Sequence, residues 1–136
     1  MSSIRPSTFL RYALLGDALA SGATGLLAFA GAGLLAPWLG LPEPLLRYAG
    51  LVLLPYALVV AVLGTRAEVV RSAVWTVIVV NALWVLDSVV LLGSGWVAPT
   101  TLGTAFVVFQ AVVVAGFAAA QAYGLRANAS ATLARA

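Results

Sequence analysis

Four long apolar runs, separated by short breaks rich in Gly and Pro, account for most of the chain. The runs span approximately Leu10–Leu35, Leu45–Gly64, Val70–Leu92 and Thr100–Tyr123. A membrane-crossing helix needs about 20 mostly apolar residues, so each run is long enough to cross. Short connections place consecutive helices antiparallel. The pattern predicts an all-α polytopic membrane protein: one antiparallel four-helix transmembrane bundle over residues 1–136, with a short tail at 125–136.

The composition agrees with a membrane protein and limits the kinds of catalytic and metal site that the chain can form. The chain is 63% hydrophobic and 8% charged, with a mean hydropathy of +1.10, which is unlike a soluble globular domain. It contains neither Cys nor His. Zinc–thiolate sites, haem–histidine ligation and His-based catalytic triads are therefore excluded. We expect no catalytic residue, no metal and no cofactor beyond a bound lipid or quinone.

The arginines predict how the bundle is oriented. Six of the seven basic residues flank the first run, the second break or the last run, and only Arg47 lies on the opposite side. Because basic residues are enriched on the cytoplasmic side, we expect both termini in the cytoplasm of a bacterial inner membrane. The arginines are spaced singly at the edges of apolar segments, which is not the clustered patch of a nucleic-acid-binding protein.

Several polar and aromatic side chains lie within the predicted spans. A rise of 1.5 Å per residue places Asn81 and Gln110 near the midplane, with Tyr56 at about the same level. One interpretation is structural: Asn81 and Gln110 bond to each other and fix the helix register. The other is a small polar cavity that binds a head group, lipid or quinone, with Tyr56, Trp84 and Phe117 as its walls. Gln121 falls on the same inward stripe as Gln110 and Phe117.

Two carboxylates, Asp17 and Asp87, also lie within the spans. Roughly 10 Å of depth separates them, so they do not form a catalytic pair. We expect Asp87 to form a structural ion pair with Arg47, the lone basic residue on its side. The candidate partners of Asp17 are Arg11, Arg66 and Arg71. If no arginine reaches Asp17, it becomes a candidate coupling acid of a proton-coupled transporter.

Small residues four apart mark the first run. The pairs are Ala18 with Gly22, Ser21 with Gly25, and Ala28 with Ala32. This spacing lets helix backbones approach closely in membranes. It suits packing either within the bundle or between protomers.

Three motifs carry a resemblance to known proteins: "LLRYAGLVLLPYALVV", "NALWVLDSVVLLGSGWVAPTTLG" and "FQAVVVAGFAAAQAYGLR". They resemble a group of small bacterial four-helix integral membrane proteins with no assigned activity, which implies a four-helix topology and an inner-membrane location. A looser similarity to DoxX-like proteins rests on an arginine and small residues that open the first helix. Small multidrug exporters share the size and helix count but use a glutamate among aromatic residues where this chain has Asp17.

The hypotheses for function follow from these features. The preferred one is a small non-enzymatic membrane protein that acts as a homo-oligomer or as an accessory subunit of a larger membrane complex, with bound lipid or quinone. The alternative is a dimeric proton-coupled transporter or exporter, with Asp17 as the coupling acid and Tyr56, Asn81 and Gln110 along the path. An enzyme acting on lipid finds support only in the two separated carboxylates.

Overall fold

The computed structural model describes residues 3–135, and their side chains up to residue 128. The elements are β1 (Ser3–Ile4), α1 (Thr8–Ala30), α2 (Ala32–Leu39), α3 (Glu43–Thr65), β2 (Val69–Val70), α4 (Arg71–Gly93) and α5 (Thr101–Arg135). Helices α1, α3 and α4 and residues Thr101–Asn128 of α5 are each long and apolar enough to cross a membrane. The all-α, multi-pass architecture predicted from the sequence is confirmed.

The first and last helices differ from their predicted bounds. The run predicted over Leu10–Leu35 breaks at Gly31, whose N–H donates to the carbonyl of Leu27 at 2.8 Å, and α2 continues as a separate helix. Helix α2 ends at Gly40, which has a φ of +66°, a conformation that glycine adopts without steric cost. Helix α5 continues through the predicted tail to Arg135. Residue 136 of that tail lies outside the described residues.

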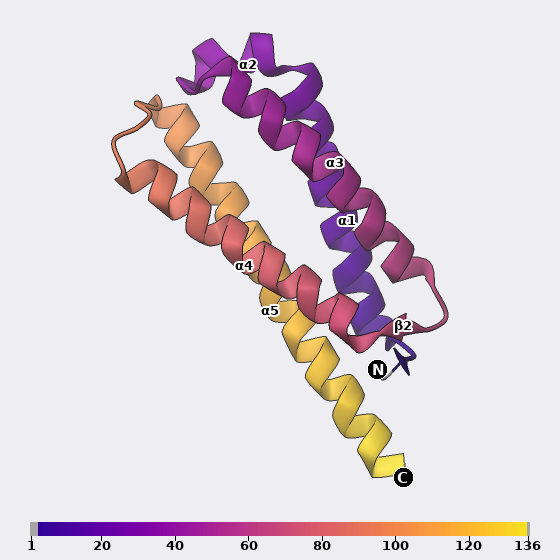
Figure 1. The fold of residues 1–136 in the computed structure, drawn as a ribbon. Coiled ribbons are helices and arrows are strands. Elements are labelled where there is room, and N and C mark those ends of the chain that lie inside the picture. Colours follow the sequence, from indigo (N-terminus) through magenta and orange to yellow (C-terminus); the bar gives the residue numbers. More distant parts are fainter. Residues whose placement is uncertain (1–2, 136) are drawn as a thin grey trace.

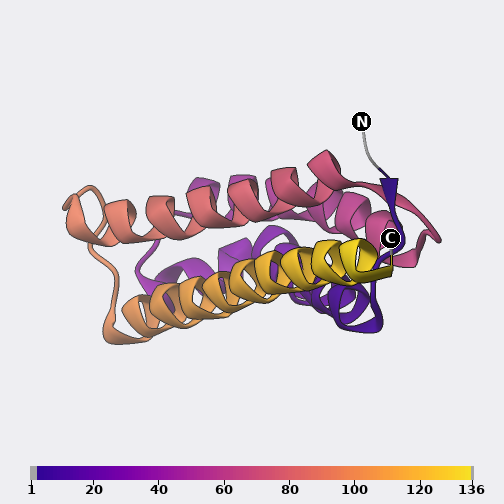
Figure 2. The same ribbon diagram turned by 90° about the horizontal axis from the view of Figure 1, so that it is seen from below.

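The four long helices form two hairpins. Helix α1 packs along α3, and α4 packs along α5, whereas the contacts between hairpins are mainly those of α1 with α5. The hairpins approach one another at the end that holds the N-terminus, here called the inner end, and diverge toward α2, at the outer end (Figure 1). Figure 2 shows α4 and α5 running antiparallel along the molecule. Within the described residues, α3 and α4 hardly touch.

A pair of glycines brings α1 and α3 together. A Cβ atom on Gly50 would lie 2.5 Å from the carbonyl oxygen of Gly25 and 2.5 Å from the backbone nitrogen of Phe29. A Cβ atom on Gly25 would lie 2.9 Å from the Cβ of Leu53. The backbones can approach this closely only because both residues lack a side chain. At this position the small residues of α1 therefore serve packing within the bundle.

Both ends of the molecule are tied together. At the inner end β1 pairs antiparallel with β2, above a hydrophobic cluster of Leu10, Leu14, Ala18, Val60, Val69, Val74, Val77 and Leu125. At the outer end the Thr100 N–H donates to the carbonyl of Leu39 at 3.0 Å, and its hydroxyl donates to the carbonyl of Trp38 at 2.7 Å. The two hairpins are thus joined at both tips while they stay apart between α3 and α4.

Candidate functional site

Asp17 is the centre of a polar cluster to which all four long helices contribute. Its side chain is buried, with the residue 1% exposed. Ser21 donates its hydroxyl hydrogen to Oδ1 at 3.0 Å. Three atoms surround Oδ2: the Tyr56 Oη at 2.8 Å, the Asn81 Nδ2 at 2.9 Å and the Gln121 Nε2 at 2.8 Å. We call these five residues the Asp17 network.

Further bonds close the Asp17 network. The Asn81 Nδ2 also donates to the Gln121 Oε1 at 3.0 Å, and the Tyr56 Oη lies 2.8 Å from the Asn81 Oδ1. The Gln121 Nε2 also donates to the backbone carbonyl of Ala13 at 3.4 Å. Of the side chains that the structure describes, no buried nitrogen or oxygen lacks a hydrogen-bond partner. The network therefore holds helices together as well as surrounding the acid.

Arg11, the candidate partner on the same helix as Asp17, binds elsewhere. The Arg11 guanidinium donates to the carbonyls of Gly64 at 2.7 Å and Arg66 at 3.1 Å. These carbonyls lie at the end of α3, where backbone acceptors have no partner within the helix. Arg11 also lies six residues before Asp17, or about 9 Å along the axis. Among the described side chains no arginine forms an ion pair with Asp17. Of the two possibilities that the sequence left open, the structure therefore has the one in which no arginine reaches this acid.

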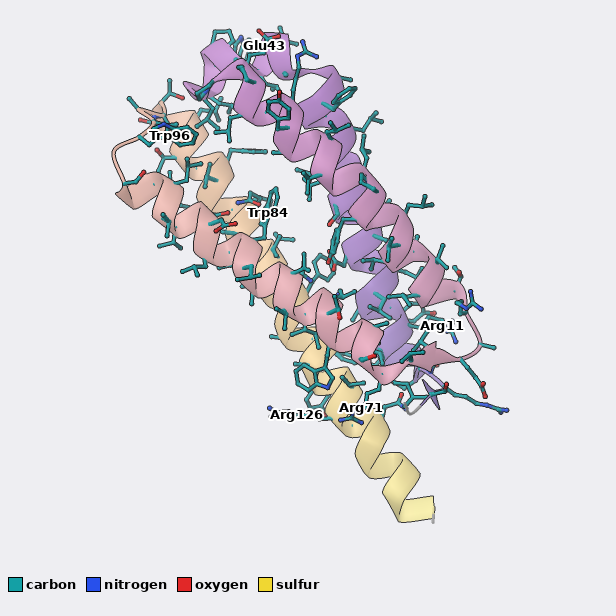
Figure 3. The ribbon with its side chains drawn as sticks, viewed as in Figure 1. Arg11, Glu43, Arg71, Trp84, Trp96 and Arg126 are labelled. Atoms are coloured by element: carbon teal, nitrogen blue, oxygen red, sulfur yellow. The ribbon has the colours of Figure 1, made fainter. Side chains whose placement is uncertain are left out.

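A second polar cluster, here the Gln110 cluster, links α4 to α5 nearer the outer end. The Trp84 Nε1 donates to the Gln110 Oε1 at 2.6 Å, and the Gln110 Nε2 donates to the Ser88 Oγ at 3.0 Å and to the Val107 carbonyl at 2.8 Å. Ser88 donates its hydroxyl hydrogen to the Trp84 carbonyl at 2.8 Å. Trp84 lies midway along α4 (Figure 3).

The predicted bond between Asn81 and Gln110 is therefore replaced by two others. Asn81 bonds to Gln121, and Gln110 bonds to Trp84 and Ser88. Gln121 follows Gln110 by three turns, about 16 Å, on the same face of α5. The sequence analysis estimated depth by counting residues from the predicted helix starts. It identified the inward face of α5 correctly but paired Asn81 with Gln110 where the structure has Gln121.

The ion pair predicted between Asp87 and Arg47 is also corrected. The Arg47 Nη2 lies 2.7 Å from the Glu43 Oε1, and its Nη1 donates to the carbonyl of Phe29 at 3.2 Å. Glu43 stands one turn earlier on the same helix, where a partner is always within reach. Asp87 lies across the gap between α3 and α4, is exposed, and forms no ion pair with any described side chain.

A cavity of about 390 Å³ separates the hairpins toward the outer end. We call it the main cavity to distinguish it from a smaller one that adjoins it. Its apolar walls include Ala28, Leu41, Leu45, Leu46, Ala49, Leu53, Leu91 and Phe106. The Gln110 cluster forms a polar part of its lining. The cavity opens between α3 and α4, where the lining residues Tyr48, Val52 and Asp87 are exposed. Trp96, in the loop after α4, is a further exposed lining residue. This opening faces sideways, along the length of the spans.

A second cavity of about 240 Å³, the side cavity, lies between α1 and α5. Asp17 and Ser21 line it, with Phe109 and Phe117 among its aromatic walls. The residues that line both cavities are Thr24, Leu53, Trp84, Phe106 and Gln110. The two cavities therefore adjoin, and Asp17 lies on the wall of the side cavity.

The residues predicted to bind a ligand divide between these features. Trp84 and Gln110 line both cavities, and Phe117 lines the side cavity. Tyr56 and Asn81 belong instead to the Asp17 network. Gln121 was not among the predicted ligand-binding residues, although its place on the inward stripe of α5 was a usable signal.

No protein-family model, curated protein or solved structure matches the chain. The resemblances to small bacterial four-helix proteins and to DoxX-like proteins stay predictions. Function therefore has to be inferred from the two polar clusters and the two cavities.

Proposed function

We propose that the protein is a small non-enzymatic protein of the bacterial inner membrane that binds an amphiphile between its two hairpins. The main cavity is the observation that carries this proposal. Little of the chain lies outside the four spans, so the protein would work as a homo-oligomer or as an accessory subunit of a larger membrane complex.

The size and lining of the main cavity support an amphiphilic ligand. Its volume of about 390 Å³ falls within the range of small-molecule pockets, about 300–1,000 Å³. Its walls are largely apolar, and its polar groups are those of the Gln110 cluster and of Asp87, Thr24, Tyr48 and Trp96. An aliphatic chain fits such walls, and the opening between α3 and α4 would admit it from the surrounding lipid.

The polar atoms favour a lipid over a quinone. The Trp84 N–H and both N–H groups of Gln110 already donate to protein acceptors, so the Gln110 cluster has no N–H left for a ligand. Asp87 adds further acceptor oxygens at the opening. A quinone carbonyl would find no free N–H in the Gln110 cluster, whereas a lipid hydroxyl or ammonium group could donate to the carboxylate of Asp87. The preferred occupant is a lipid whose head group donates hydrogen bonds.

The charge distribution supports a topology with both termini in the cytoplasm. Arg11, Arg71 and Arg126 lie toward the inner end, and Glu43 and Trp96 lie at the outer end (Figure 3). Arginine excess at one end of a bundle marks the cytoplasmic side, and tryptophans gather at membrane interfaces. The opening of the main cavity would then face the outer leaflet.

Filling the main cavity tests the proposal. Ala49 lines the cavity and is half-buried, so Ala49→Phe would occupy space that the ligand needs. Ala82, an exposed residue of α4, provides the matched control Ala82→Phe. After purification in mild detergent, mass spectrometry measures the lipid bound per protein. We expect a severalfold loss in Ala49→Phe and wild-type retention in Ala82→Phe.

Two results would contradict the proposal. Equal lipid retention in the two variants would show that the main cavity is not the binding site, and a wild-type protein without lipid would remove the ligand altogether. Native mass spectrometry in the same detergent tests the assembly: a strictly monomeric protein with no co-purifying protein would contradict action as an oligomer or subunit.

A further inference from the structure

Asp17 is a buried acid without a cation. The residue is 1% exposed, and its hydrogen-bond partners are hydroxyl and amide groups. Among the described side chains, Tyr56 on α3 is the only titratable one that is hydrogen-bonded to it. From α4 and α5 the facing groups are the uncharged Asn81 and Gln121, and Arg11 on α1 itself binds α3 carbonyls. A charged carboxylate at this depth would be costly without a cation, so the structure needs either a proton or a positive ligand there.

Counting hydrogens in the Asp17 network shows where a proton belongs. The Ala13 carbonyl can only accept, so the Gln121 Nε2 faces it and the Gln121 Oε1 faces Asn81. Asn81 must then present its Nδ2 to Gln121 and its Oδ1 to Tyr56. This leaves the Tyr56 oxygen 2.8 Å from two acceptor oxygens, the Asp17 Oδ2 and the Asn81 Oδ1.

A phenol has one hydrogen and can satisfy only one of these two contacts. A proton on Asp17 supplies the other: the carboxyl O–H donates to Tyr56, and Tyr56 donates to Asn81. When Asp17 loses this proton, the Tyr56 hydroxyl can turn to donate to the carboxylate instead. The network therefore accommodates one removable proton.

The side cavity places aromatic rings beside the acid. Phe106, Phe109, Phe117 and Trp84 line the cavity together with Asp17, and its lining includes no basic residue among the side chains up to residue 128. Aromatic faces attract cations, and the attraction is strongest where water is excluded. A carboxylate among aromatic walls matches an organic cation with an apolar body.

We propose that the Asp17 end of the side cavity binds a lipophilic organic ammonium ion in exchange for a proton. The proposal rests on the amphiphile-binding function and names the chemical class of the ligand. In the exchange the carboxyl O–H of Asp17 breaks, the proton leaves to solvent, and the ammonium ion pairs with the carboxylate. No electron is transferred, and the charge of the site stays balanced throughout.

Two probes of the same shape test the proposal. Benzyltrimethylammonium carries a permanent positive charge, and neopentylbenzene is its neutral carbon analogue. Binding to the full-length protein in lipid nanodiscs is measured by ligand-observed NMR, with proton release followed in weakly buffered solution. We expect the cation to release about one proton when it binds, and its affinity to fall as the pH is lowered, because protons compete with it for the same carboxylate.

The variant Asp17→Asn should lose proton release and the pH dependence of cation binding while it still binds neopentylbenzene. The exposed Glu43, which pairs with Arg47 at the outer end, provides the carboxylate control Glu43→Gln, which should behave as wild type. The wild-type infrared spectrum gives a readout that needs no variant: adding the cation should remove a protonated carboxylic-acid band and produce a carboxylate band.

The outcomes separate this inference from the proposed function. The amphiphile-binding function is tested separately, by lipid retention in the wild type and in Ala49→Phe. If lipid is retained and neither probe binds, only the Asp17 exchange is overturned. If neopentylbenzene binds and the cation does not, or if the cation binds without proton release and without the infrared change, only the Asp17 exchange is overturned. Cation binding with proton release that persists in Asp17→Asn would also overturn it.

Discussion

The inner and outer halves of the bundle contain the same helices but are held together differently. In the inner half the Asp17 network joins α1, α3, α4 and α5. In the outer half the Gln110 cluster joins only α4 to α5, and the hairpins part around the main cavity. Lipid is as apolar as a leucine side chain, so hydrophobicity alone gives membrane helices little reason to associate. The hairpins therefore pack together where polar contacts join all four helices, and they separate where polar contacts join only two.

The largest expected effect comes from separating α1 from α3, the hairpin that supports one wall of the main cavity. In Gly50→Ala the new Cβ would meet backbone atoms of Gly25 and Phe29 at 2.5 Å, and backbone cannot move aside as a side chain does. We expect a loss of about 3 kcal/mol in the free energy of unfolding, measured by reversible unfolding in mixed detergent.

Gly116 provides the matched control for Gly50. A Cβ atom on Gly116 would meet nothing within 4 Å, and alanine favours a helix over glycine by up to about 1 kcal/mol. Gly116→Ala should therefore be neutral or slightly stabilising. Equal destabilisation by both substitutions would show that the close approach of α1 and α3 contributes little.

The two glutamines, Gln121 in the inner half and Gln110 in the outer half, allow the most direct comparison of how much the polar contacts stabilise each half. Gln121→Leu breaks bonds to Asp17, Asn81 and Ala13 in a site where Gln121 is 0% exposed. Gln110→Leu breaks a similar number of bonds beside a cavity. We expect losses of about 2 kcal/mol for Gln121→Leu and under about 1 kcal/mol for Gln110→Leu, measured by the same unfolding assay.

The two losses differ because the side chains that lose a hydrogen-bond partner have different surroundings. Asn81 and Asp17 would stay buried with unmet hydrogen-bonding groups, whereas Trp84 and Ser88 lie beside the main cavity and can turn toward it. A larger loss for Gln110→Leu than for Gln121→Leu would reverse the comparison and place the stabilising polar contacts in the outer half.

The smallest expected effect is at the exposed outer end. The Arg47–Glu43 pair joins two side chains that are 46% and 47% exposed, one helical turn apart. Such pairs contribute about 0.3–0.5 kcal/mol, so Arg47→Met should change the free energy of unfolding by no more than about 0.5 kcal/mol. A loss above about 1 kcal/mol would instead assign Arg47 a role in joining the helices.

The sequence was sufficient for the fold and for the inward faces, but not for the partners within the site. Run lengths and breaks predicted four spanning helices, and the stripe of Asn81, Trp84 and Ser88 does face inward. Depth counting failed at Gln110 and Gln121 because both stand on one face, three turns apart, and a small error in helix ends or tilt decides between them. Charge matching failed at Asp87 because Glu43 stands one turn from Arg47 on the same helix and pairs with it.

The cavities could not be predicted because they depend on the divergence of the hairpins. No local pattern in the sequence specifies the angle between α3 and α4. That angle follows from many contacts at once, including the turn at Gly31 and Gly40 that brings α2 across the outer end to reach Thr100.

The bridge from α2 to Thr100 closes the outer tips of the hairpins and leaves the side between α3 and α4 open. A ligand would then arrive by diffusion within the plane of the bilayer and not from water. Its mole fraction in the membrane, and not its aqueous concentration, would set how much of the protein is occupied. Two ligands of equal intrinsic affinity would compete according to how strongly each partitions into lipid.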